Sequence, residues 1–279
     1  MRIDAHQHFW RYRSDTHAWI TDSMARLKHD FLPSDLQPPL TNCGFDGSVA
    51  VQAQQNVAET EWLLQLADAH PFIRGVVGWV DLCALDVADC LRRLAQHPRF
   101  RGVRHIVQDE PDDRFMLRPD FQRGIAALAQ FDLTYDILVY ARQLPAAIEL
   151  ATAFPAQRFV LDHIGKPDIR ARRIDDWRPD LARLAALPNV WCKLSGMVTE
   201  ADWNAWRSSD FTARLDIVLG LFGPDRLMIG SDWPVCLLAG EYKKVIAIVT
   251  DYIARLSDAE QSAILGRTAT RFYRLDRRS

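Results

Sequence analysis

The chain has 279 residues, 48% of them hydrophobic and 25% charged, with a formal net charge of −2 at pH 7. This length can bury one large core, and the near-neutral charge gives no reason to expect nucleic acid or an anionic membrane as a partner. No apolar run in the sequence reaches the ~20 residues that a membrane-spanning helix needs.

Eight short runs rich in β-forming residues recur along the chain, and most of them are almost continuously apolar. Such runs are typical of strands buried on both faces, as in a parallel sheet. The first run includes His6 and His8, and the alternation of side chains along a strand points both imidazoles to the same face. The predicted strands are residues 3–8, 47–52, 74–80, 102–107, 134–139, 159–164, 190–194 and 227–231.

Helical patterns separate most of these strands. Asn56 followed by Glu59, and Ser257 followed by Glu260, predict helix N-termini with capping side chains, and Pro119 suits a first helical position. The predicted helices are residues 57–70, 85–97, 119–131, 143–154, 177–187, 211–222 and 242–256, and a last one that runs from 257 toward 272–273.

Strands that alternate with helices indicate parallel βαβ units, and eight of them in this length favour a closed (β/α)8 TIM barrel. The competing doubly wound sheet usually carries a glycine-rich loop after its first strand, whereas this chain continues as His-Gln-His-Phe-Trp. No linker, low-complexity segment or repeat divides the chain, so a single domain over residues 1–279 is expected. Residues 11–39 form an unusually long connection after the first strand and are predicted to cover the mouth of the barrel as a loop.

Polar or ionisable side chains occur at the end of every predicted strand. The active sites of such barrels form at these carboxyl ends, and buried charges are costly unless they are paired or used. The clustering therefore favours a functional site, in which two imidazoles could bind a divalent metal or a polar substrate. The residues concerned are His6, His8, Gln52, Gln54, Trp79, Asp81, Arg104, His105, Asp136, Tyr140, Asp162, His163, Lys193, Ser195, Ser231, Asp232 and Trp233.

The motifs at these strand ends resemble the amidohydrolase superfamily, and more closely its amidohydrolase-2 branch of sugar lactonases and decarboxylases. The sequences DAHQHFW, GVRH, DHIGKP, KLSG and GSDWP, in this order, resemble those of the lactonases that open L-fuconolactone and related aldonolactones. The resemblance runs from Asp4 to Tyr273. It implies a hydrolase of L-fucose or related carbohydrate catabolism, with Asp232 as the base that activates water.

The resemblance also bears on the cofactor. Two-metal members of the superfamily carry a bridging Lys or Glu on strand four and a His on strand five, where this chain has Arg104, His105 and Asp136. A two-metal centre is therefore not expected. Two alternatives stay open: one divalent ion, with zinc favoured, on His6, His8 and Asp232, or catalysis without a required cofactor.

The remaining roles follow from the chemistry of ester opening. The predicted catalytic residues are Asp232, His163, Arg104, His8 and His6. Of these, His8, Arg104 and His163 are candidates to donate hydrogen bonds to the developing oxyanion. An ion pair between Lys193 and Asp136 or Asp162 is the structural alternative to a role for Lys193 in binding, and Lys166 is expected at the rim. The predicted substrate-binding residues are Gln52, Gln54, Trp79, His105, Asp136, Lys193 and Trp233.

Other functions stay open at this stage. A decarboxylase of the same branch would need a firmer metal centre, and a catalytically silent sugar-binding protein would not need Asp232. Asp232 as a turn residue before Pro234, and His6 and His8 as core side chains, are the structural alternatives. The expected partner is a small sugar lactone, with neither nucleic acid nor membrane, and the sequence does not predict an oligomeric state.

The expected location is the cytoplasm. The five cysteines are widely spaced and include no Cys-x-x-Cys pair, which predicts reduced thiols. Asp4, His6 and His8 interrupt any signal-peptide-like stretch near the N-terminus.

Overall fold

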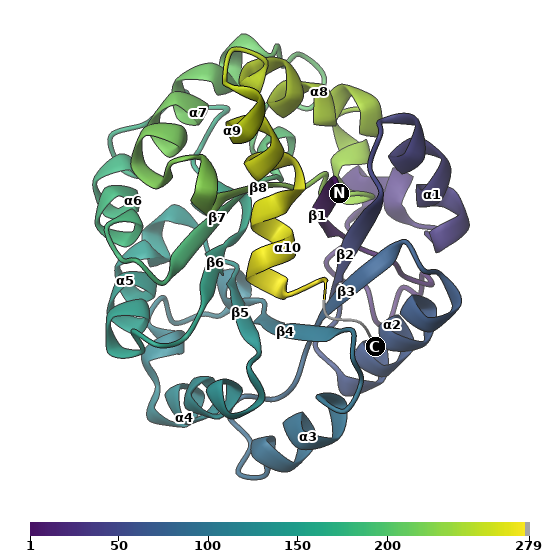
Figure 1. Cartoon of the computed structure of the whole chain (residues 1–279), viewed down its shortest axis with the longest axis vertical. Helices are drawn as coiled ribbons and strands as arrows, with labels where there is room; N and C mark the ends of the chain where they lie inside the picture. Colours follow the sequence, from purple (N-terminus) through teal and green to yellow (C-terminus); the bar gives the residue numbers. More distant parts are fainter. Residues whose placement is uncertain (277–279) are drawn as a thin grey trace.

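Eight parallel strands form a ring in the computed structural model, which describes residues 1–276 (Figure 1). Each strand pairs with the next one along the chain, so the sheet order is β1 to β8. The strands are β1 (Ile3–Gln7), β2 (Gly47–Val51), β3 (Ile73–Gly78), β4 (Phe100–His105), β5 (Thr134–Ile137), β6 (Phe159–Leu161), β7 (Val190–Leu194) and β8 (Leu227–Ile229).

The ring closes between its first and last strands. The backbone N–H of Asp232 donates to the carbonyl of His6 at 2.8 Å, and that of His8 donates to Trp233 at 2.6 Å. These two bonds join the segment after β8 to β1, and they confirm the predicted (β/α)8 barrel. The predicted strand 159–164 is too long, because His163 (φ 55°) and Ile164 (φ 51°) adopt left-handed backbone and turn the chain away from the sheet.

Helices surround the barrel on its outer face (Figure 1). The predicted capping side chains are confirmed: the Asn56 carboxamide oxygen accepts the N–H of Glu59 at 2.7 Å, and Ser257 and Glu260 cap each other. The helices are α1 (Pro33–Asn42), α2 (Val57–Ala69), α3 (Val87–Leu94), α4 (Pro119–Leu128), α5 (Leu144–Ala153), α6 (Arg178–Ala185), α7 (Ser209–Phe222), α8 (Tyr242–Ile253), α9 (Asp258–Ser262) and α10 (Thr268–Tyr273).

Two helical predictions are wrong. Helix α1 begins inside residues 11–39, which were expected to be a loop, and ends after them. Pro38 and Pro39 interrupt its sequence pattern, so the buried Leu36 and Leu40 were not recognised as one face of a helix. The last helix is broken between α9 and α10. The break includes Gly266, where a β-carbon would lie 2.2 Å from the carbonyl oxygen of Met1, so the close approach of the N-terminal backbone requires glycine there.

Helix α10 covers one end of the barrel (Figure 1). Its buried Phe272 and Tyr273 pack with strand residues that point into the ring, among them Ile3, Val49 and Val160. The larger apolar layer lies between the sheet and the outer helices. Within residues 1–276, no helix has both the length and the apolar character needed to cross a bilayer.

Candidate active site

A cavity of about 350 Å³ opens at the carboxyl ends of the strands. This volume lies in the range of small-molecule sites, and the cavity has polar groups at its base with aromatic and aliphatic side chains around them. The long segment between β1 and α1 contributes Trp19 and Met24, so this segment does line the mouth as predicted. The cavity is lined by His8, Trp10, Trp19, Met24, Ala53, Arg104, Ile106, Gln108, Asp109, Leu138, Tyr140, His163, Lys166, Thr199, Glu200, Trp203, Asp232, Val235 and Leu238.

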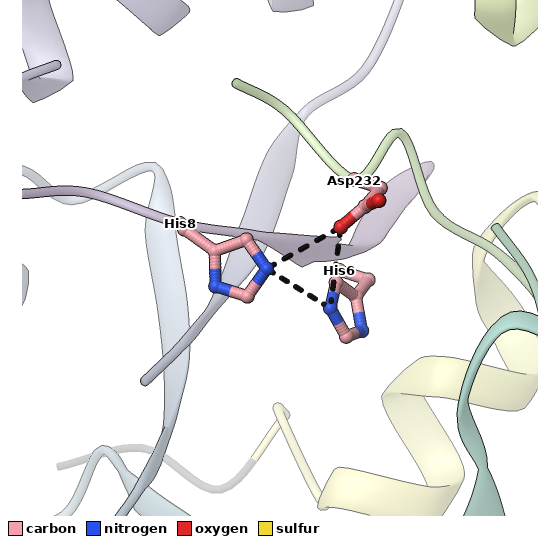
Figure 2. Close-up of side chains that lie close together, drawn as sticks. All are labelled: His6, His8 and Asp232. Atoms are coloured by element: carbon pink, nitrogen blue, oxygen red, sulfur yellow. Dashed lines mark hydrogen bonds and ion pairs between the residues drawn. The ribbon is translucent and has the colours of Figure 1, made fainter. Parts of the chain in front are cut away.

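Three side chains converge at the base of the cavity: His6 and His8 from the end of β1, and Asp232 from the segment after β8 (Figure 2). The Nε2 atoms of the two histidines are 3.2 Å apart. Asp232 Oδ1 lies 3.7 Å from His6 Nε2 and 3.4 Å from His8 Nε2. All three side chains are almost completely buried, so they form a compact group with one open side toward the cavity.

This group fits a single divalent ion. Tetrahedral zinc with bond lengths of about 2.0–2.2 Å places its ligand atoms about 3.3–3.6 Å apart, close to the three separations observed here. His8 Nδ1 lies 2.8 Å from the carbonyl oxygen of Val51, an acceptor, and donation to it leaves the Nε2 lone pair free. His6 Nδ1 lies 3.4 Å from Asp162 Oδ1, which gives the second imidazole a carboxylate partner of the kind that metal-binding histidines commonly have.

His163 lies beside this group, on the turn after β6. Its ring is edge-on to that of His6, with centroids 4.5 Å apart, and its Nδ1 lies 2.9 Å from the Ser195 hydroxyl. Burial lowers the pKa of His163 well below its usual value, so the ring is neutral at pH 7. Burial alone would raise the pKa of Asp232, but His163 and His8 outweigh it and hold the pKa below the ordinary value. Asp232 is therefore an ionised carboxylate.

Arg104 is fixed between the strands at the base of the cavity. Its Nη2 donates to the carbonyl of Gln52 at 2.5 Å, and its Nη1 donates to Asp162 Oδ2 at 3.1 Å. The same Nη1 lies 3.3 Å from His6 Nε2. The guanidinium is only 3% exposed, so a positive charge is held at the base of the cavity with little freedom to move.

A buried ionic column continues below His6 toward helix α10. Lys193 Nζ lies 3.0 Å from His6 Nδ1, donates to Asp136 Oδ2 at 2.5 Å, and forms an ion pair with Asp162 Oδ1 at 3.0 Å. The Tyr273 hydroxyl donates to the same Asp136 oxygen at 2.8 Å. Burial raises the pKa of Asp136 to about 6, whereas Lys193, His6 and Arg104 overcome burial at Asp162 and lower its pKa. These buried ionic contacts fix the position of the His6 ring through Lys193.

Asp4 connects the two segments that carry the convergent group. Its carboxylate accepts hydrogen bonds from the backbone N–H and the hydroxyl of Ser231, at 2.9 and 2.6 Å, and from the Tyr242 hydroxyl at 3.1 Å. Ser231 directly precedes Asp232, so these bonds fix the residue that carries Asp232 against the strand that carries His6 and His8.

The five predicted catalytic residues therefore lie together, whereas the predicted substrate-binding residues lie outside the cavity lining. Gln52, Asp136 and Lys193 are buried beneath it, and Gln54 lies beside His17, with its Nε2 3.1 Å from His17 Nε2. Trp79 donates to His105, which in turn contacts Glu110, and the Trp233 ring packs edge-on against Phe9 and Phe31. Their role in binding stays a prediction.

The sequence reasoning did not identify most of the cavity wall. Trp203 comes from a connection whose path the strand pattern does not predict, whereas Trp19 and Met24 belong to the long segment after β1 that was predicted to cover the mouth. Lys166 was expected at the rim and instead lines the cavity, with 13% of its side chain exposed. The sequence signal for this position was that Lys166 follows His163 by three residues, in a turn that directs both side chains to the cavity.

Comparisons with known proteins agree with this fold and identify the family. The Amidohydrolase family model matches residues 3–275, and the chain belongs to this family. An L-fucono-1,5-lactonase of Burkholderia multivorans is 47% identical over 99% of this chain and 96% of its own length. An L-fucono-1,5-lactonase of Burkholderia ambifaria is 38% identical over 100% of this chain and 97% of its own length. The predicted family is confirmed.

A solved structure agrees with the barrel described above. The crystal structure of an amidohydrolase from Burkholderia multivorans with bound zinc has a TM-score of 0.94 to this chain. The two are 46% identical in sequence, over 98% of this chain and 99% of the other.

Proposed function

We propose that this protein is a lactonase that opens a sugar lactone related to L-fucono-1,5-lactone to its aldonic acid. Both curated L-fucono-1,5-lactonases match it over almost their whole length. The observation that carries the proposal is an ionised Asp232 in the cavity, with His8, His163 and Arg104 beside it at the base. The decarboxylase alternative has no comparable support among these relatives.

Asp232 is suited to accept the proton of the attacking water. A lactone carbonyl placed against Arg104 and His163 meets donors that are already fixed, and one good donor to an oxyanion contributes roughly 2.7–4 kcal/mol to transition-state stabilisation. A positioned base adds a factor of about 10²–10⁴. These two effects suit a reactive cyclic ester, whereas an unactivated amide would need more assistance.

His6, His8 and Asp232 would hold a divalent ion, and zinc fits their spacing. When bound, such an ion would polarise the carbonyl and lower the pKa of water to about 7. His8 and Asp232 also face the cavity, and His6 lies within hydrogen-bonding distance of both Lys193 and Arg104. We propose a bound ion because two imidazoles and a carboxylate converge there.

The substrate and the location follow from the same proposal. The cavity accommodates a small molecule of the size of a monosaccharide lactone, and its aromatic walls suit the apolar face of a sugar ring. All five cysteines are free thiols, which supports the expected cytoplasmic location.

Acid release from a panel of aldonolactones tests the proposal. Purified protein is mixed with L-fucono-1,5-lactone, its stereoisomers and the corresponding 1,4-lactones, and a pH indicator follows ring opening above the spontaneous rate. We expect acid release from at least one six-membered sugar lactone. Absence of acid release from the whole panel would contradict the lactonase assignment.

A further inference from the structure

An opposite-charge pair, Lys166 and Glu200, lies in the cavity wall apart from the group around Asp232. Lys166 Nζ and Glu200 Oε1 are 3.6 Å apart, with side chains only 13% and 21% exposed. This separation is longer than a hydrogen bond. Each side chain therefore keeps hydrogen-bonding capacity for a ligand, while their opposite charges stabilise both in a partly dry environment.

The fold places the pair on two neighbouring turns. Lys166 ends a run of four left-handed residues after β6, with φ values of 55°, 51°, 74° and 46° from His163 to Lys166. Left-handed backbone is unfavourable for non-glycine residues, so this turn is maintained by its surroundings. The turn carries His163 and Lys166 to the same cavity, and Glu200 ends the short helical turn Met197–Glu200 after β7.

Neighbouring contacts position the Lys166 side chain and the Glu200 backbone. The Lys166 ammonium lies 5.2 Å from the centre of the Tyr140 ring, within the range of a cation–π contact. The backbone carbonyl of Glu200 accepts the N–H of Arg170 at 2.9 Å. Burial raises the pKa of Glu200, and Lys166 opposes that rise.

Two other polar groups of the cavity wall have partners within residues 1–276, whereas the buried side-chain oxygen of Gln108 has none there. The Thr199 hydroxyl donates to the Gly196 carbonyl at 2.6 Å, and the Gln108 amide donates to Asp109 at 3.2 Å. A ligand hydroxyl beside the pair could accept from Lys166 and donate to Glu200 at the same time. A carbonyl could only accept from Lys166, and a C–H group could pair with neither side chain.

We propose that Lys166 and Glu200 bind a hydroxyl of the substrate ring and select polyhydroxylated lactones over unsubstituted ones. This inference rests on the proposed lactonase function and adds the feature of the substrate that the cavity recognises. The reacting carbonyl lies at Asp232, and the paired charges hold a ring carbon that bears a hydroxyl. The hydroxyl bridges the ammonium and the carboxylate, and no bond to it is made or broken.

The test compares two substrates across matched variants. For wild type, Lys166→Met and Glu200→Gln, kcat/KM is measured on the preferred sugar lactone and on δ-valerolactone, which has no hydroxyl. We expect each variant to lower the ratio of kcat/KM for the sugar lactone to kcat/KM for δ-valerolactone at least ~tenfold, mainly through a higher KM for the sugar. The reason is that a site built to bind a hydroxyl loses discrimination when the side chain that binds the hydroxyl is removed. Glu149→Gln is the control, because it removes a carboxylate from the exposed Arg114–Glu149 pair and should leave the ratio unchanged.

The outcomes separate this inference from the lactonase assignment. A wild-type enzyme that opens sugar lactones, with the same substrate ratio in all variants, would overturn the role of Lys166 and Glu200 and leave the lactonase function intact. Nearly equal kcat/KM values of the wild type for the sugar lactone and δ-valerolactone would also overturn the role of Lys166 and Glu200, before any variant is measured. Absence of lactone opening by the wild type would overturn both. Circular dichroism of each variant shows whether a lost ratio reflects lost folding, and a folded variant with the predicted fall supports the proposal.

Discussion

Lys193 Nζ lies 3.0 Å from Nδ1 of His6, at a point where both side chains are fully buried inside the barrel. The same ammonium forms ion pairs with both Asp136 and Asp162. Removal of one member of a buried ionic group leaves an uncompensated charge and typically costs about 3–5 kcal/mol. We therefore predict that Lys193→Met lowers the free energy of unfolding by about that amount in urea titrations at pH 7.

Lys243→Met is the matched control for this change, because Lys243 is an exposed lysine on α8. Exposed substitutions usually change stability by no more than about 0.5 kcal/mol. Equal stability of the two variants would show that the buried column contributes nothing specific.

The barrel itself was predictable because each buried strand leaves a continuous apolar run between helical patterns. His6, His8 and Asp232 were predictable for the same reason, since the ends of parallel strands meet at one face. The contacts of Lys193 were not, because whether a lysine on β7 meets Asp136 or a substrate depends on strand register. Much of the apolar wall of the cavity was missed for another reason: residues such as Trp203 lie on connections with no periodic pattern. Trp19 was predicted near the mouth only as part of the long connection after the first strand.

His163 is predicted to be needed for turnover because its neutral ring lies beside Asp232 at the base of the cavity. If the Ser195 hydroxyl donates to Nδ1, the proton resides on Nε2, which can then donate to the oxyanion. We expect His163→Asn to lower kcat about 10²-fold or more, measured by acid release. Ser195→Ala should produce a smaller fall. A normal rate in His163→Asn would remove this residue from the catalytic site.

Glu59 should make stability depend on pH. Its carboxylate is 6% exposed and accepts the N–H groups of Ala53 and Gln54, yet burial raises its pKa from 4.5 to about 8. Between these pH values the folded chain holds a proton that the unfolded chain has lost, so the stability contributed by Glu59 falls as pH rises through this window.

Glu59→Gln keeps a carbonyl acceptor for both N–H groups and does not titrate. We expect the melting temperature of the wild type to fall relative to that of Glu59→Gln between about pH 5 and pH 9. Parallel melting curves for the two proteins over this range would contradict the raised pKa of Glu59.

Metal binding is predicted to involve one ion per chain. Chelator-treated protein should take up about one equivalent of zinc in a calorimetric titration, because three ligand atoms already converge. His8→Ala should bind much more weakly, whereas His97→Ala, at a partly exposed ion pair with Asp68, should bind normally. Unchanged zinc binding in His8→Ala would place the ion elsewhere.

The most direct test of the account is the rate at which Asp232→Asn opens L-fucono-1,5-lactone. The amide has nearly the same shape as the carboxylate but cannot accept the proton of the attacking water. We predict that the wild type releases acid well above the spontaneous rate, and that the folded Asp232→Asn protein does not exceed that rate. Wild-type turnover by Asp232→Asn would contradict the central claim that this carboxylate activates water to open a sugar lactone.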